Sequence, residues 1–127
     1  MSEPTVKRYA HFLDVTAFIE LQFSAAIVKG AFDDSDGVYL VGSSLSRKDW
    51  RDVDVRQIIA DEEFERRFGE FVEPYDRNHF LRAFNLGISG WMNVRSGLPI
   101  DYQVQPITKA NELYPLESNP RKGLGLL

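Results

Sequence analysis

The sequence of 127 residues contains no cysteine, which excludes disulfide bonds and thiolate metal sites. It also contains no apolar run that approaches the roughly 20 residues of a membrane-spanning helix. The first twelve residues mix charged and apolar side chains and lack the apolar segment of a secretory signal. These absences lead us to expect a cytoplasmic protein that does not enter the membrane.

Basic residues are too few and too scattered to indicate a general nucleic-acid-binding protein. The 15 Lys and Arg residues against 19 Asp and Glu residues give a formal net charge of −4 and a pI near 5.1. Nucleic-acid-binding domains usually gather basic side chains into a stripe that contacts phosphates. This composition still permits a local contact to RNA or DNA.

What the sequence does contain favours one packed domain. Hydrophobic residues make up 43% of the chain and aromatic residues 13%, which argues against disorder. A chain of this length can bury a substantial core. We find neither an internal repeat nor a low-complexity segment.

Three segments have the apolar spacing of amphipathic helices. They run from His11 to about Gly30, within 61–71, and from about Asp76 to Ser96. The residues that form the apolar face of the first helix are Phe12, Val15, Ile19, Phe23, Ala26 and Ile27. Gly97 and Pro99 are expected to end the third helix.

Three shorter segments predict strands, over 38–41, 52–59 and 99–105. With the helices between them, they indicate an α/β or α+β domain with a small mixed sheet of three or four strands and helices packed on one face. The core is expected over residues 1–105. Residues 106–127 are punctuated by Pro and Asn and are expected to form a C-terminal tail over the surface.

Two of these strands carry carboxylates that can share one face of the sheet. Side chains alternate along a strand, so Asp52 and Asp54 point the same way, and Asp101 joins them if the two strands pair. Clustered carboxylates repel one another unless a cation lies among them. Their oxygens suit Mg²⁺ or Mn²⁺, which bind through one or two carboxylates together with substrate phosphates.

A glycine–serine turn between the first two strands predicts a phosphate-binding site. Gly42 allows a ligand to approach the backbone closely, and N–H groups at a helix start bind phosphate oxygens. Hydroxyl groups and positive charges follow in the same loop at Ser43, Ser44, Arg47, Lys48 and Arg51. Basic residues in such a loop are more often only solvated.

Two other motifs fail at defined positions. In a calcium-binding EF-hand loop with Gly37 at its sixth position, Phe32 and Ser43 would stand where carboxylates are required. The nucleophile turn of a serine hydrolase needs glycine where Ser46 stands. Both classes are therefore excluded.

Taken in order, three motifs resemble the nucleotidyltransferase superfamily typified by DNA polymerase beta. They are Gly42-Ser43, then Asp52-Val53-Asp54, then Ile100-Asp101-Tyr102. The resemblance covers roughly residues 10–105 and is closest to the small stand-alone members of bacteria, archaea and phages. The chain departs from those members at Ser44, where they often carry arginine, and we expect no second domain for the acceptor within these residues.

The resemblance implies transfer of a nucleoside monophosphate from an NTP, ATP in the first place, to an acceptor hydroxyl with release of pyrophosphate. Asp52, Asp54 and Asp101 would bind Mg²⁺ or Mn²⁺, and Asp101 would help to deprotonate the acceptor. The triphosphate would contact Gly42, Ser43, Ser44, Arg47 and Lys48. The acceptor (a protein, an RNA or a small molecule) and a homo-oligomeric state stay open.

A function of another class fits the same residues. The domain could be a catalytically silent nucleotidyltransferase-like module that binds a protein or a nucleotide, as an antitoxin or regulatory partner does. All three carboxylates are retained, which favours the enzyme, because an inactive site gains nothing from charges that repel one another. An acidic scaffold protein is the third and least favoured alternative.

Overall fold

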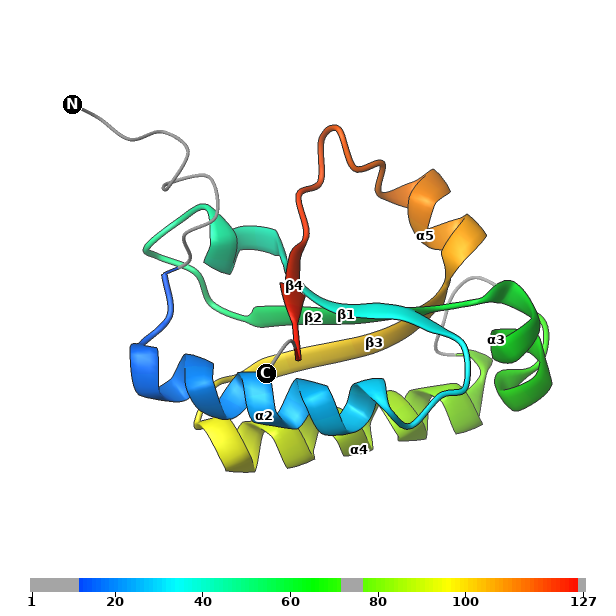
Figure 1. Ribbon diagram of the computed structural model, residues 1–127, viewed down its shortest axis with the longest axis horizontal. Helices are drawn as coiled ribbons and strands as arrows, with labels where there is room; N and C mark the ends of the chain where they lie inside the picture. Colours follow the sequence, from blue (N-terminus) through cyan, green and yellow to red (C-terminus); the bar gives the residue numbers. More distant parts are fainter. Residues whose placement is uncertain (1–11, 72–76, 126–127) are drawn as a thin grey trace.

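The computed structural model describes residues 12–71 and 77–125, which form a four-stranded mixed sheet with helices (Figure 1). The elements are α2 (Val15–Lys29), β1 (Ser35–Val41), the 3₁₀ helix η1 (Gly42–Leu45), β2 (Val53–Ile59), α3 (Asp61–Phe68), α4 (His79–Ser96), β3 (Ile100–Pro106), α5 (Ile107–Leu113) and β4 (Lys122–Leu124). The predicted fold class, a small mixed sheet within an α/β (α+β) domain, is confirmed.

The strands lie in the order β3–β2–β1–β4. β1 pairs antiparallel with both β2 and β4, whereas β2 and β3 are parallel. Parallel neighbours need a long crossover connection, and α3 and α4 supply it here. The register sets Asp54 beside Asp101 on β3 and beside Val41 on β1.

One face of the sheet is covered by α2 and α4, which lie side by side (Figure 1). The strand residues fully buried in this core are Val38, Leu40, Val53, Val55, Ile59, Tyr102 and Val104. Because side chains alternate along each strand, Asp54, Arg56 and Asp101 point to the opposite face. The helices α2 and α4 therefore lie on one side of the sheet and the carboxylates of Asp54 and Asp101 on the other, as the sequence predicts.

A buried polar network holds β2 and β3 together within this core. The Tyr102 hydroxyl donates to Oε1 of Gln57 at 2.6 Å. The Gln57 amide in turn donates to the carbonyl of Val28 at 3.1 Å and to Oγ of Ser35 at 3.2 Å. Burial raises the pKa of Tyr102, which keeps the phenol protonated as a donor. The network thereby joins four elements: α2, β1, β2 and β3.

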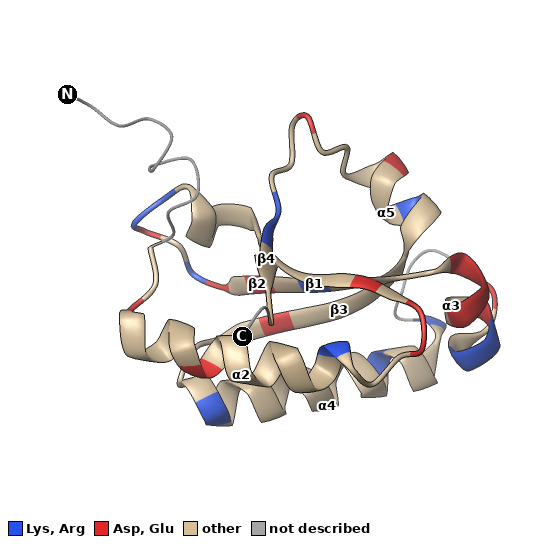
Figure 2. Cartoon of the chain, viewed as in Figure 1, with Lys and Arg blue, Asp and Glu red and all other residues tan. Residues whose placement is uncertain are grey.

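The apolar face of α2 is not the one that the spacing predicts. The buried residues are Leu21, Ser24, Ala25 and Val28. The side chains expected in the core are instead 47–70% exposed: Val15, Ile19, Phe23 and Ile27. The helix carries apolar side chains of its own on all sides, so the spacing of these residues does not indicate which side is buried. Figure 2 shows few charged residues along α2. The helix itself is confirmed, although His11 lies outside the described residues.

The long helix α4 ends where the sequence predicts. Asn78 caps its start by accepting a hydrogen bond from the Leu81 N–H at 3.0 Å, and Gly97 follows its end with a φ of +76°. The expected start near Asp76 lies outside the described residues. Among the residues that the structure describes, no helix combines the length and the apolar character needed to cross a membrane.

The C-terminal residues correct the expectation of a tail. Within 106–125 the chain forms α5 and then β4, which extends the sheet by pairing with β1. Leu124 is 1% exposed and belongs to the core, and the Gly125 N–H donates to Oε1 of Gln22 in α2 at 2.6 Å. A three-residue strand is too short to show alternation, so its sequence does not reveal this long-range pairing.

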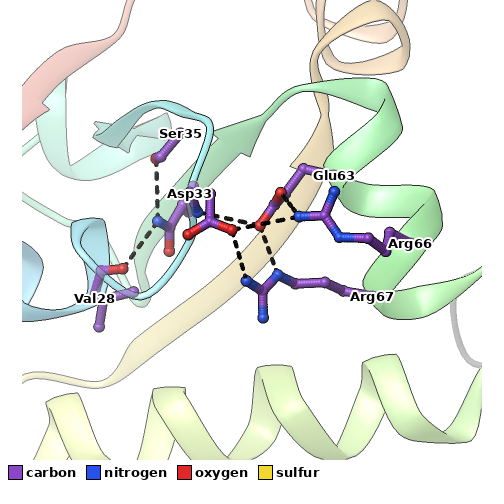
Figure 3. Close-up of polar contacts among 7 residues, drawn as sticks. Val28, Asp33, Ser35, Glu63, Arg66 and Arg67 are labelled. Atoms are coloured by element: carbon purple, nitrogen blue, oxygen red, sulfur yellow. Dashed lines mark hydrogen bonds and ion pairs between the residues drawn. The ribbon is translucent and has the colours of Figure 1, made fainter.

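A charged cluster links α3 to the loop before β1 (Figure 3). Glu63 is 2% exposed and accepts hydrogen bonds from Nε of Arg67 at 2.6 Å, from Arg66, and from the Asp33 N–H at 3.2 Å. Both arginines also pair with the Asp33 carboxylate, at 3.5 and 3.6 Å. The hydrogen bond from Arg67 is the main reason that the pKa of Glu63 lies below its usual range.

Glu63→Gln should lower the melting temperature by several degrees at neutral pH, because it removes the charge that holds both guanidinium groups. A carboxylate whose pKa is lowered by folding stabilises the protein fully at pH values above the usual Glu pKa of about 4.3. This stabilisation is lost as the pH falls through the pKa that the group has in the folded protein. The difference between the two proteins should therefore narrow in acid.

Thermal unfolding followed by circular dichroism between about pH 3 and pH 7 measures both effects. The matched control is Glu65→Gln, on the exposed side of the same helix, which should change the melting temperature little. Equal losses in the two variants would show that the Glu63 cluster does not stabilise the fold.

Candidate functional site

Two acidic side chains meet on the face of the sheet that α2 and α4 leave open. Asp54 of β2 and Asp101 of β3 are register partners on parallel strands, so they project on the same side. Their side chains are 27% and 48% exposed, respectively. The predicted meeting of these two carboxylates is thus present in the structure.

Asp52 lies just outside β2, in an exposed bend before Val53. Its charge still acts on Asp54, whose pKa it helps to raise. Within residues 12–71 and 77–125, however, no three acidic or histidine side chains form a group that could hold a metal ion. The structure therefore assembles the pair Asp54 and Asp101 but not the predicted group of three.

The environment of Asp54 disfavours its charge. Burial raises the pKa of this carboxyl most, and the negative charges of Asp101 and Asp52 raise it further. Within the part of the chain that the structure describes, the Arg56 guanidinium is the one influence on this carboxyl that lowers its pKa. Two carboxylates that repel each other in a half-buried position suit a divalent cation that takes its other ligands from water and phosphate oxygens.

Arg56 lies against both carboxylates and was not among the residues that the sequence motifs single out. Its Nη2 is 3.9 Å from Oδ1 of Asp54 and 3.7 Å from Oδ2 of Asp101. Its Nη1 donates to the Asp101 carbonyl at 2.7 Å and to the Val55 carbonyl at 3.0 Å. The alternation that puts Asp52 and Asp54 on one face extends to Arg56, so this signal was present in the sequence.

The glycine turn packs directly on Asp54, one member of the acidic pair. Gly42 starts η1 with a φ of +80°, a conformation that favours glycine. A Cβ built on Gly42 would overlap Oδ2 of Asp54, which belongs to the neighbouring strand. The absence of a side chain at Gly42 therefore makes room for a carboxylate of the protein itself.

A cavity of about 750 Å³ opens above this face of the sheet, within the size range of ligand pockets. Asp54 and Arg56 line it from the sheet and Gly42 from the turn after β1, whereas Asp101 is not among its lining residues. Tyr114 and Arg121 line it from the C-terminal segment. The segment that the sequence suggests is a tail therefore supplies one wall of the cavity.

Arg121 brings a second cation to this cavity. It donates from Nη2 to Oδ1 of Asn111 at 3.0 Å and to the Tyr114 carbonyl at 3.3 Å, and its guanidinium lies 5.9 Å from the centre of the Tyr39 ring. Among the ion pairs of the described residues, none includes Arg121. Its position depends on the pairing of β4 with β1, which no local pattern predicts.

The other residues predicted to bind phosphate surround the turn without lining the cavity: Ser43, Ser44, Arg47 and Lys48. Ser44 is completely buried, and its hydroxyl has no hydrogen-bond partner among the described residues. Arg47 is exposed and pairs with Asp49 at 3.0 Å, and Lys48 is exposed as well. The structure thus brings Gly42 to Asp54 but leaves the Arg47 and Lys48 side chains in solvent.

Gly42→Ala should destabilise the protein twice over, through backbone strain of about 1–2 kcal/mol at positive φ and through overlap with Asp54. Gly97→Ala is the matched control, because Gly97 has a φ of +76° and an added Cβ would meet nothing within 4 Å. Chemical denaturation should show a larger loss of unfolding free energy for Gly42→Ala. Equal losses of unfolding free energy in the two variants would mean that the position of Asp54 does not require the absence of a side chain at Gly42.

Comparison with known proteins assigns no family to the chain. No protein-family model matches it, and neither does any curated protein or solved structure. Its function must therefore be inferred from the residues of the site.

Proposed function

We propose that the chain is a metal-dependent nucleotidyltransferase that transfers a nucleoside monophosphate from an NTP, ATP in the first place, to an acceptor hydroxyl. Pyrophosphate is the other product. The main support is the register of Asp54 with Asp101 on the open face of the sheet, directly beside Gly42. A cavity of about 750 Å³, lined by Gly42, Asp54 and Arg56, offers room for a nucleotide beside this pair.

In this proposal Asp54 and Asp101 hold Mg²⁺ or Mn²⁺ through their carboxylate oxygens, with Asp52 adding negative charge nearby. The bound metal would supply positive charge to the reacting phosphate and to the attacking oxygen. Asp101, the more exposed of the pair, is the residue that would accept the proton of the acceptor hydroxyl.

The triphosphate is proposed to lie between Gly42 and Arg121, which both line the cavity. A guanidinium pairs well with phosphate oxygens, and the fork of Arg121 has donors beyond the Nη2 that contacts Asn111 and Tyr114. Arg121 would then supply the positive charge that the glycine turn lacks at Ser44.

One observation favours the catalytically silent module as a second candidate. Arg56 partly neutralises Asp54 and Asp101 without any metal, so the retention of repelling carboxylates does not by itself require a cation from solution. Such a module would bind a nucleotide or a protein in the same cavity and transfer nothing. The two candidates differ in the transfer reaction, which can be measured.

Asp54→Asn and Asp101→Asn should each abolish transfer of label from α-³²P-labelled NTPs to acceptors in a cell extract with Mg²⁺. Removing a repelling carboxylate should leave the melting temperature of the metal-free protein unchanged or raise it. Asp49→Asn, which changes an exposed carboxylate outside the cavity, is the matched control and should retain transfer. Nucleotide binding without transfer by the parent protein would favour the silent module.

Arg121→Gln should weaken the binding of a non-hydrolysable ATP analogue with Mg²⁺ by about tenfold, because it removes charge-assisted hydrogen bonds to phosphate. Isothermal titration calorimetry measures this affinity. Arg47→Gln removes the same charge from the exposed loop and should have little effect. A loss in Arg47→Gln with no change in Arg121→Gln would instead locate the phosphates at the loop.

A further inference from the structure

Arg56 is held in place by hydrogen bonds to the backbone of two strands, whereas its contacts with the two carboxylates that it faces are longer ion pairs. Its two hydrogen bonds, at 2.7 and 3.0 Å, go to carbonyls of β3 and β2. Its Nη2 approaches Asp54 and Asp101 only to 3.9 and 3.7 Å, longer than the 2.7–2.9 Å of charge-assisted hydrogen bonds. The positive charge is therefore fixed, while the carboxylate oxygens keep their capacity to bind another ligand.

The charge of Arg56 is also poorly screened by solvent. Its side chain is 17% exposed, less than that of Asp54 or Asp101. Charges a few ångströms apart interact more strongly in such a half-buried position than in water. A guanidinium that attracts the two carboxylates must repel any cation that binds between them, and it cannot move away without breaking both backbone hydrogen bonds.

We propose that Arg56 is a built-in counterion of the acidic pair, which weakens the binding of a free divalent cation and favours a cation that arrives with a triphosphate. This inference rests on the proposed function, because it concerns the same two carboxylates. A triphosphate brings negative charge that Arg56 attracts. This attraction offsets the repulsion between Arg56 and the divalent cation, but only when the cation arrives bound to the nucleotide. Arg56 is thus a specificity-determining residue for the form in which the metal binds.

The test compares Mn²⁺ affinity in the parent protein and in Arg56→Gln by electron paramagnetic resonance, first with Mn²⁺ alone. Loss of the fixed charge should tighten binding of free Mn²⁺ by about tenfold or more. With a non-hydrolysable ATP analogue added, the parent should bind Mn²⁺ much more tightly than before, and the variant should gain far less. Arg82→Gln is the matched control, since it removes an equal charge from the exposed surface of α4, outside the cavity, and it should behave like the parent.

Two further variants separate charge from structure. Arg56→Lys retains the charge and should keep the weak affinity for free Mn²⁺, whereas Arg56→Met, neutral and of similar length, should behave like Arg56→Gln. Unchanged affinity for free Mn²⁺ in the neutral variants overturns the inference and leaves the proposed function standing. If both neutral variants fail to fold, Arg56 is a structural bridge between strands and the inference is wrong. If no protein in the series binds Mn²⁺ with or without nucleotide, the proposed function fails as well.

Discussion

The parallel pairing of β2 with β3 in one register determines how Asp54, Arg56 and Asp101 meet on the open face of the sheet. A slip of one residue would turn Asp101 toward the helices and Tyr102 toward the cavity, because side chains alternate along a strand. The buried hydrogen bond between Tyr102 and Gln57 holds this register from the core side. The hydrogen bond from Arg56 to the Asp101 carbonyl holds it from the open side. The core and the site thus depend on the same contact between strands.

The sequence predicts the features of this protein that arise from short-range periodicity. Alternation locates the strands and puts Asp54 and Asp101 on one face, and glycine marks the turn at position 42. The buried face of α2 is not predictable in this way, because Val15 and Ile19 are as apolar as the residues that pack inward. The place of β4 depends on a partner far away in the chain, and so does the position of Arg121 in the cavity.

In both candidate functions, Arg56 partly compensates the negative charge of the acidic pair. The acidic pair carries two negative charges and Arg56 one positive charge, so one negative charge remains, with Asp52 close by. A silent module needs no more than this partial compensation to stay folded. An enzyme needs the remaining negative charge to attract a cation, and it needs the compensation to be incomplete. The presence of one arginine, and not two, at the pair is compatible with a metal that is bound weakly until a nucleotide supplies further ligands.

One wall of the cavity comes from a C-terminal segment that is anchored at both ends. Near its start, the Thr108 N–H and hydroxyl donate to the Asp61 carboxylate at 3.0 and 2.5 Å, and at its end β4 pairs with β1. Between these anchors, residues 111–119 are mostly exposed and contribute few buried apolar side chains. Segments of this kind have low local stability, so the pairing of β4 with β1 has to contribute most to fixing the position of Arg121. The last strand of the sheet therefore serves the cavity as well as the core, since it brings the Arg121 guanidinium to the cavity that Asp54 also lines.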